Sequence, residues 1–172
     1  MALYSLGAST PNIDADAYVH PDAVLIGAVT LGAGSSVWPG AVIRADDAPI
    51  VIGARTSIQD GSVVHTTVPF PTMIGDDVVV GHMVHLEGCT IEDLTLIGSG
   101  SVVLHEAVVH TGSIVGANAV VTNRMVVPSG SMALGVPAKV RPADVSVELI
   151  RLNADNYVQR ARRYRAELRR VD

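Results

Sequence analysis

Aliphatic residues recur every six positions along most of this chain. Nineteen units begin with Val, Ile or Leu, and the residue four positions after each start is usually small or aliphatic. A constant six-residue period is typical of a parallel β-helix, in which each unit supplies one short strand and one corner. Three units close one triangular coil, so the pattern predicts a stack of about six coils. The starts are Ile13, Val19, Leu25, Leu31, Val37, Ile43, Ile52, Ile58, Val64, Ile74, Val80, Leu86, Ile91, Ile97, Val103, Val109, Val115, Val121 and Val127.

The period is interrupted by insertions before residue 52 and between residues 64 and 74. We expect these insertions to project from the β-helix and to border one region of its surface. An ordinary β-sandwich of alternating strands is the competing fold, but it does not predict one register over more than a hundred residues.

The period changes near the C-terminus. Between residues 147 and 171, apolar residues recur every three or four positions, which predicts an amphipathic helix. Pro142 precedes this segment, and Asp144 or Ser146 can cap its start. The chain is therefore expected to be all-β over 1–141, with a C-terminal α-helix over 142–172 that packs on the β-helix.

Composition and charge narrow the function classes. Hydrophobic residues make up 48% of the chain but aromatic residues only 3%, so the core must be built from Val, Ile, Leu and Ala. We find no apolar run of the ~18 residues that a membrane span needs, and therefore expect no membrane partner. The net charge of -5 argues against nucleic-acid binding. The single Cys89 cannot form an internal disulfide, which fits a cytoplasmic protein.

Stacking the coils brings polar residues into columns. Residues in the same slot of successive coils lie ~4.8 Å apart. Arg44, His65 and Glu87 each follow the third start of a coil and share one corner, whereas Asp60 and His82 form a column on another face. His65 and Glu87 can approach one metal ion, but His82 can join them only from a neighbouring chain. A threefold trimer would build three such shared sites.

Six segments of the chain carry a family resemblance. They resemble the gamma-class carbonic anhydrases and their bacterial relatives, which are often labelled ferripyochelin-binding or phenylacetate-operon proteins. The resemblance covers nearly the whole chain and implies a single-stranded left-handed β-helix, a homotrimer and a zinc site shared between subunits. The segments are IRADD (43–47), IGARTSIQDGSVVH (52–65), IGDDVVVGH (74–82), LEGCTI (86–91), LGVPAKVRP (134–142) and NADNYVQRARRY (153–164).

In this family three histidines bind the metal. Two of them match His65 and His82, but the pattern L-H-G-C reads LEGC here, so Glu87 stands in the place of the third ligand. We take Glu87 as that ligand, because two histidines and a glutamate form a known catalytic zinc set. His85 is the weaker substitute: it faces the same side of the strand but lies ~7 Å from position 87.

Further site residues follow from the resemblance. It implies that an Arg44–Asp46 pair and a Gln59–Asp60 pair surround the metal, and that Tyr157 leans over the site from the helix. We expect zinc, with Fe²⁺ or Co²⁺ as other possible ions. We expect His20, His105 and His110 to be solvated single residues without a role.

The function implied is reversible hydration of CO2 to bicarbonate by a metal-dependent lyase, weakened or latent because Glu87 is anionic. Two alternatives stay open. One is a hexapeptide acyltransferase that uses His82 or His85 as general base with an acyl-CoA donor. The other is a non-catalytic binding or scaffold trimer.

Overall fold

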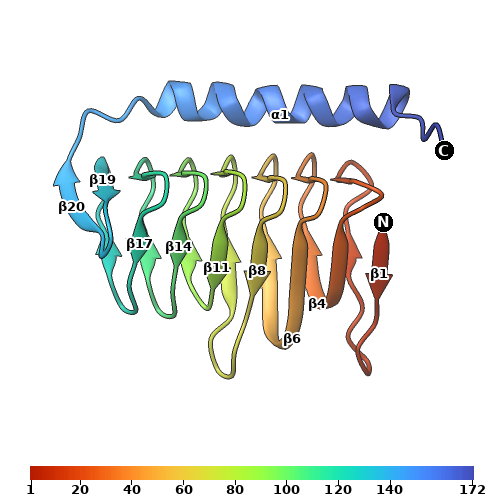
Figure 1. Cartoon of the computed structure of the whole chain (residues 1–172), viewed down its shortest axis with the longest axis horizontal. Helices are drawn as coiled ribbons and strands as arrows, with labels where there is room; N and C mark the ends of the chain where they lie inside the picture. Colours follow the sequence, from red (N-terminus) through yellow and green to blue (C-terminus); the bar gives the residue numbers. More distant parts are fainter.

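The computed structural model describes all residues 1–172 and shows a left-handed parallel β-helix with one α-helix along its side (Figure 1). The predicted fold class is therefore confirmed. Of the nineteen repeat starts, all but Ile13 and Val19 in the first coil are buried, and the small residues four positions later are buried with them. The narrow interior admits aliphatic residues in stacked layers, as the composition predicted.

Two faces of the prism belong to one continuous sheet, because two long strands, β4 and β6, run through the corner between them. Its strands are β1 (Ala2–Tyr4), β2 (Asn12–Ile13), β4 (Val24–Leu31), β6 (Val42–Ile52), β8 (Val63–His65), β9 (Thr72–Ile74), β11 (His85–Glu87), β12 (Thr90–Ile91), β14 (Val102–Val103), β15 (Val108–Val109), β17 (Val120–Val121) and β18 (Val126–Val127).

The third face is a separate sheet. Its strands are β3 (Tyr18–Val19), β5 (Ser36–Val37), β7 (Ser57–Ile58), β10 (Val79–Val80), β13 (Leu96–Ile97), β16 (Ile114–Val115), β19 (Ser131–Leu134) and β20 (Lys139–Pro142). All pairs in both sheets are parallel except β19 with β20, which reverses the chain at the end of the stack.

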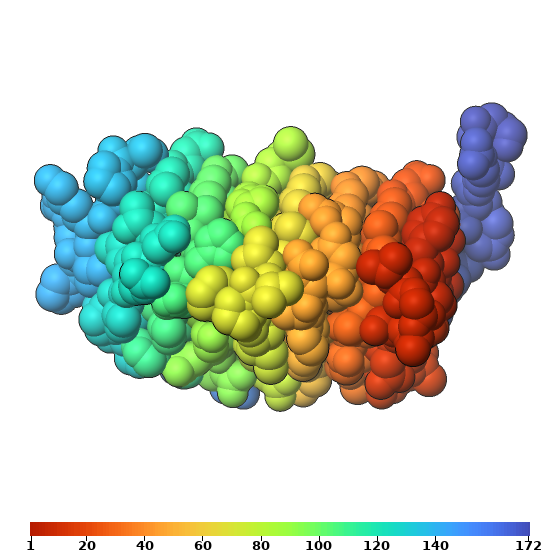
Figure 2. Space-filling view, turned by 90° about the horizontal axis from the view of Figure 1, so that it is seen from below, coloured from red at the N-terminus to blue at the C-terminus, as the bar shows by residue number.

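Two features lie outside the predicted register. Residues 2–4 form β1, which adds a strand to β4 ahead of the first predicted unit. The insertion between residues 64 and 74 projects from the stack, and is the yellow segment that stands out on the face seen in Figure 2. It folds back through an antiparallel bridge between Thr67 and Phe70.

Helix α1 (Val147–Glu167) runs back along the third face, so that both chain termini lie at the same end of the molecule (Figure 1). Ser146 caps it, as predicted, by accepting a hydrogen bond from the N–H of Leu149 at 3.3 Å. Ile150, Ala154 and Ala161 are buried beneath it. The helix ends at Glu167, so the prediction that its pattern continued to Val171 was wrong.

Aromatic residues fasten the helix to the third face. Tyr18 and Trp38 are buried with Ala161, and Tyr157 and Tyr164 pack against this group. The indole N–H of Trp38 donates to the hydroxyl oxygens of Ser36 and Ser57, each at 3.0 Å. Four of the six aromatic side chains of the protein thus gather at this one interface. The helix is not long and apolar enough to cross a membrane.

Candidate metal centre

The predicted column of polar residues is present at the corner through which β6 runs and at which β8 and β11 end. His65 lies opposite Arg44 on one neighbouring strand and opposite Glu87 on the other. The Nδ1 atom of His65 lies 3.2 Å from Oε1 of Glu87, and its Nε2 atom lies 3.1 Å from Oδ1 of Asp46. Arg44 in turn donates a hydrogen bond to Asp46. The six-residue register therefore placed Arg44, His65 and Glu87 together correctly, and Asp46, which the family resemblance implied, joins them.

Both nitrogens of His65 contact carboxylates. A neutral imidazole has only one N–H to donate, so the two contacts are not equivalent unless the ring is protonated. Burial acts to raise the pKa of Asp46, but hydrogen bonds from Arg44 and His65 outweigh it and hold that pKa below its usual value of 3.8. Asp46 is thus an anion that orients His65 on one side and is anchored by Arg44 on the other.

Glu87 lies at the centre of a cluster of histidines. Its Oε2 atom is 3.1 Å from Nε2 of His85, and its Oε1 atom is 3.5 Å from Nε2 of His105 as well as close to His65. The Glu87 side chain is only 18% exposed. Burial acts to raise its pKa, but the hydrogen bonds from His85 and His65 and the nearby His105 lower it overall. Glu87 is therefore a partly buried carboxylate whose two oxygens are shared among three imidazoles.

The expectation that His20, His105 and His110 are solvated singles was wrong. His20 is buried and its Nδ1 accepts the backbone N–H of Asp22, while His110 lies 2.9 Å from a carboxylate oxygen of Glu92. His105 joins the Glu87 cluster because its coil lies directly after that of β11. The segment that projects from the stack also covers His105, since Phe70 packs against its ring at 5.7 Å between centroids.

A second group lies at the corner that follows β7 and β10. The Nδ1 atom of His82 is 2.9 Å from Oδ2 of Asp60, and its Nε2 atom has no hydrogen-bond partner in the chain. The side chain of His82 is 52% exposed. A histidine that binds a metal usually donates its other ring N–H to a carboxylate in this way. His82 is therefore oriented by Asp60 with one nitrogen presented outward.

Gln59 and Tyr157 flank this second group. Gln59, next to Asp60 in the chain, is 4% exposed. The ring of Tyr157 packs on Trp38 at 5.5 Å between centroids. Burial raises the pKa of Tyr157, and the charge of Asp60 raises it further, while Arg160 acts in the opposite direction. Tyr157 thus lies beside Asp60 as a protonated phenol.

The two groups are not one site within the chain. No three His, Cys, Asp or Glu side chains are arranged to hold a metal ion. The donor types nevertheless fit a divalent metal, because imidazole and carboxylate are ordinary zinc ligands. His65 and Glu87 lie at one corner and His82 at another, so a metal that uses all three needs two chains.

The negative charge at Glu87 predicts a pH dependence of stability. The pKa of Glu87 is lower in the folded state than its usual 4.5. The ionised carboxylate therefore stabilises the folded protein above pH 4.5, and this stabilisation is lost as the pH falls through the pKa of the folded state. We expect Glu87→Gln to lower the free energy of unfolding by about 1–3 kcal/mol at pH 7. Urea unfolding between pH 7 and pH 3 should show the two proteins converging at the acid end. A constant difference across that range would contradict this account.

Comparison with known proteins agrees with this architecture. The chain is 42% identical over 167 residues to a protein named carbonic anhydrase from Geobacillus kaustophilus, with 95% of this chain and 91% of the relative covered. It is 39% identical over 165 residues to gamma carbonic anhydrase 1, mitochondrial, from Arabidopsis thaliana. That match covers 91% of this chain but only 60% of the plant protein. No protein-family model matches the chain.

Among solved structures, a hexapeptide transferase family protein from Anaplasma phagocytophilum is similar with a TM-score of 0.91 and 34% identity. The match covers 95% of this chain and 98% of that one. Fold and repeat thus define the class, a hexapeptide-repeat left-handed β-helix. Within that class, the sequence relatives show that the chain belongs to the gamma carbonic anhydrase family.

Proposed function

We propose that this protein is a metal-dependent lyase that reversibly hydrates CO2 to bicarbonate in a homotrimer of the cytoplasm. Family membership implies a metal cofactor, for which we propose zinc. The observation that carries the proposal is His82, an exposed histidine oriented by Asp60 with a free Nε2. In the trimer, His65 and Glu87 of one chain and His82 of its neighbour would hold the ion.

A divalent ion at this position supplies a Lewis acid that lowers the pKa of a bound water toward neutrality. The residues of the chain prepare that position. Asp60 orients His82, and Asp46 orients His65 while Arg44 anchors Asp46. His65 would bind the ion by giving up one of its two carboxylate contacts.

The remaining residues act on the substrate in this proposal. Arg44, whose side chain is 43% exposed, offers positive charge to the bicarbonate anion. Gln59 and Tyr157 lie beside Asp60, where an amide and a protonated phenol can donate hydrogen bonds to a bound oxyanion. Glu87 lowers the net charge at the metal relative to a histidine, so we propose that the activity is weaker than in relatives with three histidines.

Subunit complementation tests the shared site. His65→Ala and His82→Ala chains should each lack metal and CO2 hydration when assembled alone. When the two variants are co-refolded in equal amounts, an intact site forms wherever a neighbour supplies the missing histidine. Random mixing in a cyclic trimer predicts that about one quarter of the wild-type metal content and hydration rate returns. Elemental analysis and stopped-flow CO2 hydration measure both quantities.

The matched control is a mixture of His65→Ala with the double variant His65→Ala, His82→Ala, which contains no intact pair. A rate in the complementing mixture no higher than this control would disprove the shared site, as would a monomer by light scattering at micromolar concentration. Thiol release from acetyl-CoA, lost on His82→Ala or His85→Ala, would instead support the acyltransferase alternative.

A further inference from the structure

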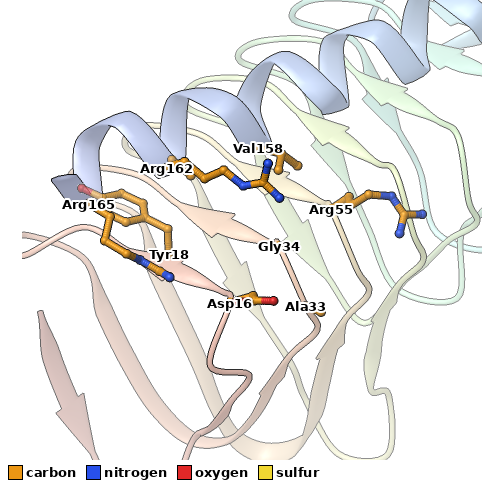
Figure 3. Close-up of a pocket in the computed structure, with 9 residues that line it drawn as sticks. Asp16, Tyr18, Ala33, Gly34, Arg55, Val158, Arg162 and Arg165 are labelled. Atoms are coloured by element: carbon orange, nitrogen blue, oxygen red, sulfur yellow. The ribbon is translucent and has the colours of Figure 1, made fainter. Parts of the chain in front are cut away.

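A pocket of about 240 Å³ lies under the C-terminal half of α1, and no residue of the candidate metal centre lines it. Figure 3 shows that it is formed between the helix and the corners that precede β3, β5 and β7. Asp16, Gly34 and Arg55 come from three successive coils, and Arg162 and Arg165 come from the helix. The volume equals roughly eight water molecules at ~30 Å³ each, which is enough for a small organic molecule.

Two of the three arginines in this pocket have no acidic partner. The charge of Arg55 is already neutralised by a bidentate ion pair with Asp77. Its Nε donates to Oδ1 at 2.7 Å and its Nη2 donates to Oδ2 at 2.6 Å. Arg165 donates only to the backbone carbonyls of Ala15 and Ala17, so its charge is uncompensated. Arg162 makes no hydrogen bond and no ion pair, although its side chain extends along the pocket in Figure 3.

The one acidic residue that lines the pocket is Asp16, and its carboxylate forms no ion pair. Two guanidinium groups without an acidic partner therefore oppose one carboxylate. Arg165 lies in the last turn of α1, where a cation also stabilises the helix dipole, so it has a structural role as well. Arg162 has no such carbonyl contacts, so its solvent-exposed guanidinium group is available to a ligand in the pocket.

Tyr18 supplies a fixed aromatic wall to the pocket. It lines the pocket and is only 7% exposed, yet its hydroxyl group is buried without a hydrogen-bond partner. Trp38 packs on the Tyr18 ring at 5.6 Å and Tyr164 at 6.3 Å between centroids, so the ring is held in place. Its hydroxyl group is fully enclosed, so a molecule in the pocket meets the ring and not the hydroxyl group.

The apolar lining limits the kind of ligand. Ala33, Val158 and Ala161 line the pocket together with the ring of Tyr18. Guanidinium groups bind carboxylate and phosphate oxygens with two parallel hydrogen bonds. We propose that the pocket binds a small organic anion, with its carboxylate or phosphate group at Arg162 and Arg165 and its apolar part against the helix.

The single tryptophan, Trp38, makes this binding measurable because it packs on Tyr18. Phenyl phosphate, benzoate and inorganic phosphate are titrated against the intact protein at constant ionic strength while Trp38 fluorescence is recorded. We expect saturable binding of at least one aromatic anion. Arg162→Gln should weaken it about tenfold, which is the usual loss for a charge-assisted hydrogen bond.

Arg151→Gln is the matched control, because it removes the same charge from the same helix at a position that does not line the pocket. It should bind as the wild type does. His82→Ala should also bind normally, which separates this site from the proposed metal centre even if the proposed lyase activity is absent. Tighter binding of phenyl phosphate would identify a phosphate ester as the ligand class, and equal or tighter binding of benzoate a carboxylate.

Three results would overturn the proposal. The wild type could show no saturable binding of any of the three anions. Arg162→Gln could bind as tightly as the wild type. Alternatively, His82→Ala could abolish binding, which would place the anion at the metal centre instead.

Discussion

Replacing Glu87 with histidine should raise the metal content of the purified protein and its rate of CO2 hydration by on the order of tenfold. Glu87 lies opposite His65 in the strand register, at the position where the family pattern has a histidine. A neutral ligand leaves more positive charge on the metal to acidify its water. The substitution would also remove the carboxylate whose oxygens now contact ring nitrogens of His65, His85 and His105. Elemental analysis without chelators and stopped-flow hydration give the two readouts.

Two further variants decide which residue is the third ligand. His85→Ala should leave the metal content nearly unchanged if Glu87 binds the ion. Glu87→Gln, which keeps the size but removes the charge, should lose most of the metal. If Glu87→His changes nothing while His85→Ala removes the metal, then the ligand has moved to position 85 and our assignment of Glu87 is wrong.

Removal of α1 by truncation after Ala143 should lower the free energy of unfolding by on the order of 5 kcal/mol at ~25 cal/mol per Å² of apolar surface. The truncation exposes the faces of Tyr18 and Trp38 that the helix covers, and leaves β20 in place. Urea unfolding followed by circular dichroism measures the change. Unchanged stability would show that the helix is an independent tail.

Two point variants in α1 test the same docking without removing the helix, so that gross misfolding does not confuse the result. Ile150 is 2% exposed and its neighbour Leu149 is 60% exposed on the same turn. Ile150→Ala should cost about 2–4 kcal/mol, whereas Leu149→Ala should cost less than about 0.5 kcal/mol. Equal losses for the two variants would mean that α1 does not dock as the structure shows.

The six-residue period was sufficient to predict most of the fold. One aliphatic residue per unit points inward, so the spacing of starts also determines which outward residues stack in adjacent coils. That geometry correctly placed Arg44, His65 and Glu87 at one corner and separated His82 from them. The amphipathic pattern likewise identified the buried residues of α1, because a helix on a flat face buries one stripe.

Other features depend on details that the period does not contain. His105 follows the column of Glu87 by one position, and only its side-chain direction and the packing of Phe70 bring it to that carboxylate. Strand β1 places Leu3 in register with the start Leu25, but the residues between Leu3 and Ile13 break the six-residue spacing, so the period did not predict this strand. The pocket at Arg162 requires knowing how α1 lies over the coils. The spacing of repeats within one chain also does not show how a neighbouring chain would bring its His82 to His65.

The reversed strand β20 has a consequence for how copies of this protein can meet. A stack of parallel coils ends in open strand edges onto which another copy could add, and repetition of that contact would give a fibre. Here β20 runs antiparallel to β19, and the turn before it covers β17 through hydrogen bonds between Val120 and residues Gly135 and Ala138. The β17 edge and the third face are therefore closed to the addition of a further parallel coil at this terminus. Contact through the flanks of the prism, where His65 and His82 lie, is what the proposed shared site requires.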